Sequence, residues 1–253
     1  MPDQKPDFEP HDLLAAFSLL TRLPVPVDHA QAGKRAANAA WAYPLVGLIL
    51  GGLLGVLGVF LGWIGIPNGM VAAFILLGFA MATGAMHEDG LADFADGIWG
   101  GTTVERRLEI MKDSRIGAYG AVALIVFLLA RFSGIAALQG WDLMLTLAAV
   151  GAGSRALMVG VMFMIDPAKP LGLSASAGQP SAQKTGVALA IGLLACVVLT
   201  GFSGIILFAA MAIAIIPVCT IALKKLGGQT GDVLGTAQQC AEVAGLAAAI
   251  ALL

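Results

Sequence analysis

Seven long apolar runs, separated by short polar segments, set the pattern of this chain. Each run is close to the roughly 20 residues that an α-helix needs to cross the hydrocarbon core of a bilayer. The runs cover residues 42–66, 70–86, 118–138, 143–165, 185–200, 205–223 and 237–253. The pattern predicts an all-α, polytopic transmembrane helix bundle of about seven spans. No linker or change of composition interrupts it, so residues 1–253 are expected to form a single integral-membrane domain.

The first apolar run is rich in glycine. Its glycines are Gly47, Gly51, Gly52, Gly55, Gly58 and Gly62. Several of them lie four residues apart, a spacing that lets two helix backbones approach closely in lipid.

Residues 1–40 form a polar segment ahead of the first span. Within it, residues 11–22 are amphipathic but too few to cross a bilayer, so we expect an interfacial helix there. The segment lacks the basic start, apolar core and small-residue cleavage site of a signal peptide. The N-terminus is therefore expected to be cytoplasmic.

The distribution of basic residues agrees with this orientation. The expected outer connections, residues 67–69, 139–142 and 201–204, contain no Lys or Arg. Twelve of the fourteen basic residues fall on the inner side, and they are Lys5, Arg22, Lys34, Arg35, Arg106, Arg107, Lys112, Arg115, Lys169, Lys184, Lys224 and Lys225. This positive-inside asymmetry predicts that segments 87–117 and 224–236 share the cytoplasmic face.

Composition narrows the class of protein further. The mean hydropathy of +0.89 and the 12% of charged residues are typical of integral membrane proteins. No basic patch with interleaved aromatic residues is present, so nucleic-acid binding has no support. Cys196, Cys219 and Cys240 lie in or beside apolar runs without metal-ligand spacing, and we interpret them as small buried hydrophobic residues.

An acidic stripe follows the second run. Asp89, Asp93 and Asp96 lie at i, i+4 and i+7, which on a helix places their carboxylates within roughly 60° of arc. Such like charges repel one another, and a cation that prefers oxygen ligands would remove the repulsion. The stripe therefore predicts a divalent-metal site, with a solvated helix face as the alternative. His87 beside it is a candidate base.

Two further segments carry candidate chemistry. Lys112, Asp113, Ser114 and Arg115 precede Gly117 and Gly120, so that cationic donors and a hydroxyl stand beside permissive backbone, which suits phosphate oxygens. The segment 224–236 contains Gly-Gly-Gln-Thr-Gly-Asp, which ends at Asp232. Its amides and carboxylate can bind phosphate or complete a metal site, and the alternative is a plain interhelical turn.

Three charged residues lie inside the apolar runs, namely Arg131, Arg155 and Glu242. A carboxylate within a membrane marks either a functional group or a specific ion pair, and Arg155 is a candidate partner for Glu242. Arg131 and Arg155 could also extend toward the interface. From the residues alone, phosphoryl transfer fits best, with Mg²⁺ on the aspartates and an alcohol as the attacking group.

At this point the motifs resemble those of a known family, the cobalamin synthases, or adenosylcobinamide-GDP ribazoletransferases. The matching stretches, in the family's order and over essentially the whole chain, are residues 20–26, 43–47, 87–97, 109–117 and 227–235. The segment Met-Lys-Asp-Ser-Arg-Ile-Gly at 111–117 is the most specific of them. The loop at 166–178 matches only loosely, and no role is assigned to it.

The resemblance implies a Mg²⁺-dependent transferase in the bacterial cytoplasmic (inner) membrane, with its active site facing the cytoplasm. The 3′-hydroxyl of α-ribazole, or of its 5′-phosphate, would attack adenosylcobinamide-GDP and expel GMP. Asp89, Asp93 and Asp96 would hold the metal, and Asp232 and His87 are the candidate catalytic groups. The expected substrate-binding residues are Lys112, Asp113, Ser114, Arg115, Gln229 and Thr230.

Other readings stay open at this point. A CDP-alcohol phosphotransferase-like or prenyltransferase-like membrane enzyme also places aspartates at helix ends. A transporter would use Glu242 with Arg131 or Arg155 along a path. The sequence also leaves open a homo-oligomer, or a complex with other enzymes of cobalamin assembly.

Overall fold

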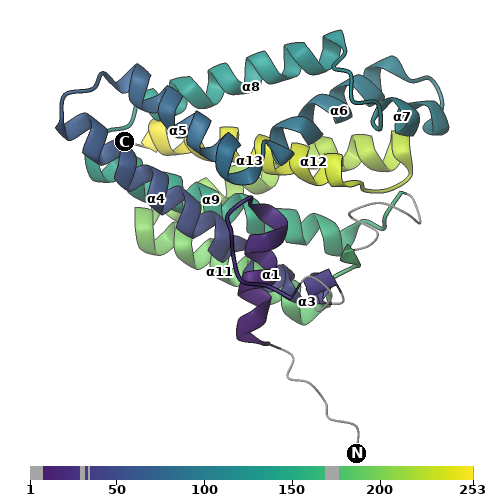
Figure 1. The fold of residues 1–253 in the computed structure, drawn as a ribbon, viewed down its shortest axis with the longest axis horizontal. Helices are drawn as coiled ribbons and strands as arrows, with labels where there is room; N and C mark the ends of the chain where they lie inside the picture. Colours follow the sequence, from purple (N-terminus) through teal and green to yellow (C-terminus); the bar gives the residue numbers. More distant parts are fainter. Residues whose placement is uncertain (1–7, 29–31, 34, 169–176, 253) are drawn as a thin grey trace, which may run out of the picture.

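A computed structural model of the protein describes residues 8–28, 32–33, 35–168 and 177–252. Over these residues the chain is helical, and the one β-type contact is an isolated bridge between Pro167 and Gln229. The elements are α1 Pro10–Leu20, α3 Ala36–Ala39, the 3-10 turn η1 Ala40–Ala42, α4 Tyr43–Trp63, α5 Asn68–Thr83, α6 Met86–Gly100, α7 Val104–Ile110, α8 Ala118–Ala136, α9 Gly140–Met164, α11 Ala182–Thr200, α12 Ser203–Leu226 and α13 Gly231–Leu252 (Figure 1).

The prediction of an all-α bundle with about seven spans is confirmed. Within the described ranges, six helices or helix runs are long and apolar enough to cross a membrane: residues 36–63, α8, α9, α11, α12 and α13. The pair α5 and α6 passes the same test together, although its two helices meet at 88°. The second apolar run therefore does not lead straight into the acidic segment but turns a corner first.

The corner between α5 and α6 is made by two residues in the left-handed conformation. Gly84 has φ 66° and Ala85 has φ 55°, and Ala85 is the one described non-glycine residue with a positive φ. Arg22 from the N-terminal segment lies against Gly84, where an added Cβ would come within 2.6 Å of its Nε. The backbone N–H of Arg22 also donates to the carbonyl of Ala82 at 2.7 Å. The corner is thus held from outside by the N-terminal segment.

Helix α9 forms the centre of the bundle. Every residue from 146 to 162 is buried, and the helix contacts α4, α11, α12 and α13. Among the described helices, the contact between α4 and α9 is the most extensive. Gly47 of α4 faces Gly151 of α9 so closely that a Cβ on Gly47 would lie 1.9 Å from the Gly151 carbonyl oxygen. The glycine spacing of the first run therefore serves the close packing that it predicted.

The expected amphipathic segment forms α1, which packs against α3, η1 and α4. Asp12 of α1 is fully buried and pairs with Arg35 at 2.9 Å, while the indole of Trp41 donates to the same carboxylate at 3.1 Å. Burial would raise the pKa of Asp12, but the hydrogen bonds from Arg35, the Glu9 backbone and Trp41 outweigh it and hold the pKa below its usual value.

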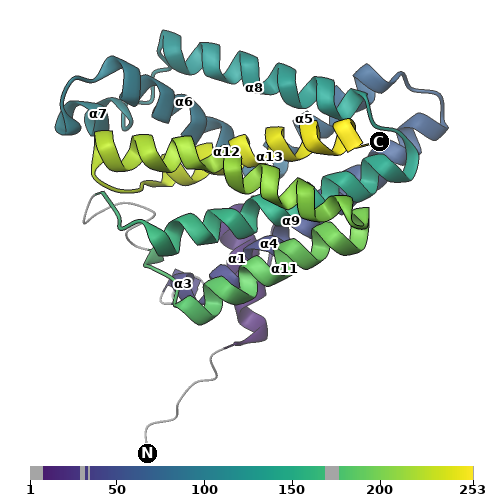
Figure 2. The same ribbon diagram turned by 180° about the vertical axis from the view of Figure 1, so that it is seen from behind.

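Most connections between helices fall at two ends of the bundle, whereas the corner between α5 and α6 lies between those ends (Figures 1 and 2). One end carries the α4–α5 turn, the α8–α9 turn and the C-terminus. The other end carries α7 and the α12–α13 turn, as the charge distribution predicted. Lys5, Lys34 and Lys169 lie outside the described residues, and the orientation of the bundle in a membrane stays a prediction.

Candidate functional site

The site is built where α6 and α13 touch. A Cβ on Gly90 of α6 would lie 3.0 Å from Cα of Asp232, and a Cβ on Gly235 of α13 would lie 3.2 Å from the carbonyl oxygen of His87. The Thr236 hydroxyl also contacts the Gly90 carbonyl oxygen at 3.2 Å. Because both helices have glycine at the crossing, the first turn of α13 lies directly against the acidic stripe of α6.

The carboxylates of the two helices gather around Asp93. Asp93 is half-buried and interacts electrostatically with Asp89, Asp232 and Asp96. Asp89 is exposed, and Asp232 is half-buried. The structure thus brings Asp232, some 140 residues away in sequence, into the cluster that the spacing of the stripe predicted.

Asp96 differs from the other members of the stripe because its oxygens already accept hydrogen bonds. The backbone N–H groups of Gly117 and Gly120 donate to its carboxylate at 2.7 and 2.9 Å. A Cβ on either glycine would lie 2.3 Å from a carboxylate oxygen of Asp96. Asp96 therefore caps the N-terminus of α8 and ties it to α6. Its assignment as a metal ligand stays a prediction.

The donor set suits Mg²⁺ in one particular mode. Within the part of the chain that the structure describes, no three His, Cys, Asp or Glu side chains are arranged closely enough to hold a metal ion by themselves. Mg²⁺, however, is usually held by one or two carboxylates together with waters and substrate phosphates, rather than by an all-protein cage. Asp93 offers hard carboxylate oxygens of that kind, and the charges of Asp89 and Asp232 act on it.

The predicted phosphate segment forms an exposed loop between α7 and α8. Lys112, Ser114 and Arg115 are exposed, and the Arg115 guanidinium pairs with the carboxylate of Asp113 at 2.7 Å. Hydrogen bonds from the side chain and the backbone N–H of Arg115 lower the pKa of Asp113 to about 2. Asp113 therefore orients Arg115 while leaving the guanidinium accessible, and its own contact with a substrate stays a prediction.

Gln229 and Thr230 of the Gly-rich turn make hydrogen bonds that hold the turn and the start of α13 in place. Gln229 is 2% exposed, and its main chain exchanges hydrogen bonds with Asp166 and Ala168, at the start of the loop to which no role was assigned. The Thr230 hydroxyl accepts from the N–H of Val233 at 3.3 Å, which caps the first turn of α13. Residues 169–176 of that loop lie outside the described residues. Direct substrate contacts of Gln229 and Thr230 stay predictions.

Two contacts that the sequence did not predict join the motif segments. The Arg107 guanidinium of α7 donates to the Lys225 carbonyl at the end of α12 at 3.2 Å. The Lys225 ammonium group lies 4.4 Å from the ring centroid of Trp99 at the end of α6. The α6–α7 segment and the end of α12 are therefore tied together at Lys225.

His87 lies on the inner side of α6. It is 3% exposed, its Nε2 has no hydrogen-bond partner among the described residues, and the charges of Arg155 and Arg131 act on it. These arginines belong to the interior of the bundle and not to the acidic cluster. The role of His87 as a catalytic base stays a prediction.

A substitution at the crossing tests whether the two helices form one site. Gly90→Ala places a methyl group against the backbone of Asp232, so we expect a clear fall in catalytic activity with the protein still folded. Gly100→Ala, at the far end of the same helix, meets only an ordinary contact at 3.5 Å and serves as control. The measurement is turnover per folded protein, and equal turnover of the two variants would contradict the interpretation.

The fold and the site together define a polytopic membrane protein with a polar site at one end of its bundle. The chain belongs to the CobS family, described as cobalamin-5-phosphate synthase, whose model matches residues 12–250. A protein of Bradyrhizobium diazoefficiens is 40% identical over 237 residues, which cover 92% of this chain and 90% of the relative. A protein of Sinorhizobium medicae is 42% identical over 248 residues, covering 94% and 95%. Both relatives are named adenosylcobinamide-GDP ribazoletransferase. No solved structure matches the chain.

Proposed function

We propose that this chain joins adenosylcobinamide-GDP to α-ribazole, or to its 5′-phosphate, as an adenosylcobinamide-GDP ribazoletransferase. In this reaction an acceptor hydroxyl attacks the phosphorus on the cobinamide side, the bond from that phosphorus to the GMP oxygen breaks, and GMP leaves. The proton of the hydroxyl passes to a base. The observation that carries the proposal is the electrostatic interaction of Asp93 with Asp89 on its own helix and with Asp232 on α13.

The residues divide into two roles in the proposed reaction. Lys112 and Arg115 bind the diphosphate, because exposed cations neutralise its charge and Arg can contact two phosphate oxygens at once. Asp232 stands at the first turn of α13, within reach of the acidic cluster, and is the candidate acceptor of the hydroxyl proton. Its position beside Thr230, whose hydroxyl donates to it at 3.1 Å, keeps the carboxylate oriented.

Mg²⁺ is the proposed cofactor, and Asp89 and Asp93 are its first candidate ligands. When bound, the ion neutralises charge on the phosphate oxygens. Asp96 is a weaker candidate, because both of its oxygens already accept backbone hydrogen bonds. We further propose that the protein lies in the bacterial inner membrane with this end of the bundle in the cytoplasm, which the distribution of Lys and Arg supports.

The deciding experiment is a coupling assay with purified protein in lipid nanodiscs. Adenosylcobinamide-GDP and α-ribazole or its 5′-phosphate are supplied with Mg²⁺, and GMP and the corrinoid product are measured. We expect equal amounts of both products, and none when Mg²⁺ is chelated. CDP-alcohol and prenyl diphosphate donors run in parallel as controls. Consumption of one of those donors in place of the corrinoid would contradict the proposal.

A further inference from the structure

A buried ionic network lies behind the acidic cluster, and Arg131 of α8 is its centre. Arg131 is 2% exposed, and one of its guanidinium nitrogens donates to Glu88 of α6 at 2.7 Å and to Gln239 of α13 at 3.0 Å. Its other terminal nitrogen pairs with Glu242 of α13 at 2.9 Å. One side chain therefore joins the two helices whose carboxylates form the candidate site.

The network continues into the core and is balanced in charge. The second oxygen of Glu242 pairs with Arg155 of α9 at 3.4 Å and also accepts from the amide of Gln238. Two glutamates and two arginines thus compensate one another. Because burial makes an unpaired charge costly, the loss of any one of these four charges leaves a partner unpaired and destabilises the whole network.

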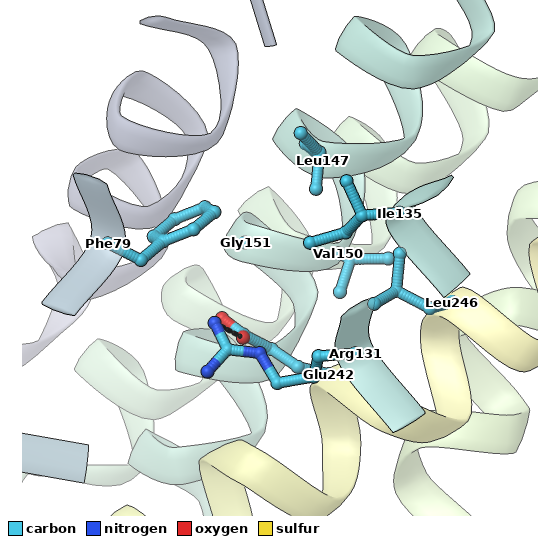
Figure 3. A pocket seen from close by; sticks show the side chains of 8 residues that line it. All are labelled: Phe79, Arg131, Ile135, Leu147, Val150, Gly151, Glu242 and Leu246. Carbon is cyan, nitrogen blue, oxygen red and sulfur yellow. Dashed lines mark ion pairs between the residues drawn. The ribbon is translucent and has the colours of Figure 1, made fainter. Parts of the chain in front are cut away.

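The surroundings leave the Arg131 guanidinium little freedom. Figure 3 shows Arg131 and Glu242 side by side, with mainly apolar side chains on the remaining walls. The cavity that these side chains line measures about 10 Å³, roughly the space that one water molecule needs. The ring of Phe79 lies 5.7 Å from the guanidinium carbon. Arg131 is therefore confined to the partners that α6 and α13 provide.

The position of Glu88 connects this network to the site. Glu88 directly precedes Asp89, so the ion pair with Arg131 fixes α6 at the start of its acidic stripe. At the other end of the stripe, Asp96 is held by the backbone of α8. Helix α6 is thus tied to α8 at Glu88 and at Asp96. Asp89 and Asp93 lie between these two residues in the sequence.

We propose that Arg131 is a positioning residue, which fixes α6 against α13 and thereby sets the affinity with which the cluster around Asp93 binds a divalent cation, with Asp89 and Asp93 as its first candidate ligands. The proposal rests on the proposed function, since it takes this cluster to be the metal site. Arg131 is buried and acts through Glu88 and Glu242. A merely structural arginine would change stability but not the affinity for the ion.

The test compares Arg131→Met with Arg155→Met. Both substitutions remove a buried cation that pairs with Glu242, but among the ion pairs of the described residues only that of Arg131 with Glu88 joins α6. Mn²⁺ binding is titrated by electron paramagnetic resonance on protein in nanodiscs, with and without the product GMP as a source of phosphate oxygens, and thermal unfolding is followed in parallel. We expect Arg131→Met to weaken Mn²⁺ binding by about ten- to a hundredfold. Arg155→Met should lower the unfolding temperature and leave the Mn²⁺ affinity unchanged.

Two further variants keep the test decisive if Arg131→Met is too unstable to purify. The double variant Arg131→Met with Glu88→Gln removes one charge of each sign, so the network stays neutral while the tie to α6 is lost. Its Mn²⁺ affinity should be as low as that expected for Arg131→Met alone. Arg131→Lys keeps the charge and should recover part of the affinity. In GMP release, the Arg131 variants should regain activity at higher Mg²⁺, which a partly unfolded enzyme would not do.

The outcomes separate the two proposals. Wild-type Mn²⁺ affinity in the Arg131 variants, or an equal loss of affinity in Arg155→Met, overturns the positioning role and leaves the proposed function intact. Wild-type protein that forms product but binds no Mn²⁺ overturns the metal site, and the positioning role with it. Wild-type protein that binds Mn²⁺ but forms no product contradicts the proposed reaction alone, and the affinities of the variants still decide the role of Arg131.

Discussion

Asp93→Asn should reduce GMP release on the order of a thousandfold, since several kcal/mol of transition-state charge stabilisation are at stake. Asp93 is the centre of the acidic cluster, with carboxylates on its own helix and Asp232 on α13 as neighbours. Asparagine keeps the size of the side chain but removes the negative charge that a divalent cation needs. The measurement is GMP release by protein in nanodiscs across a Mg²⁺ titration.

Asp142→Asn is the matched control for this substitution. Asp142 is an exposed carboxylate in the first turn of α9, at the opposite end of the bundle from α7 (Figure 1). The Asp142→Asn variant should retain full turnover. Wild-type turnover of Asp93→Asn with an unchanged dependence on Mg²⁺ would remove Asp93 from the site.

Gly47→Ala should have the largest effect on folding. The added methyl carbon would lie 1.9 Å from the Gly151 carbonyl oxygen, which belongs to the backbone of the central helix and has no rotamer by which to move away. The two helices must separate, so we expect a loss of about 3 kcal/mol or more of stability. Thermal unfolding and the yield of monodisperse protein in detergent measure it.

The same helix supplies the control for this effect. Gly52 has no heavy atom within 4 Å of the position where a Cβ would be added. Gly52→Ala should therefore be neutral or stabilising by up to about 1 kcal/mol, because alanine favours the helix more than glycine does. Equal yields of the two variants would mean that α4 and α9 do not pack through Gly47.

The spans could be predicted from the sequence because each is a long apolar run with few charges. The corner between α5 and α6 could not. Only Gly84 hinted at a break, and the left-handed conformation of Ala85 is imposed by its tertiary setting. The apolar run at 70–86 continues into the corner without a proline, so hydropathy alone extends the helix past its true end.

The site could be predicted in part for a similar reason. Helical periodicity placed Asp89 beside Asp93, and the basic residues placed Asp232 on the same side of the bundle. Periodicity cannot show which oxygens are already engaged, and so the contact of Asp96 with Gly117 and Gly120 was missed. The two glycines after the basic segment were the available signal, since a carboxylate can approach their backbone closely.

Of the buried ionic network, the sequence predicted only one ion pair. The pairing of Glu242 with Arg155 is confirmed, at 3.4 Å. The shorter pair between Arg131 and Glu88 was not predicted, because Glu88 stands next to the acidic stripe and was assigned no partner. Equal numbers of Arg and Glu within or beside the spans were the signal that could have suggested a closed network.

The corner at Gly84 and Ala85 also bears on the lipid around the protein. Helix α5 has 16 residues, about 24 Å of length, against a hydrocarbon core of about 30 Å. Since α6 turns away at 88°, it adds almost nothing along the axis of α5. If α5 stands along the bilayer normal, thinning of the bilayer beside it would relieve the resulting hydrophobic mismatch. Head groups and water would then descend toward Asp89, so the acyl-chain length of the host membrane becomes a determinant of how the site is hydrated.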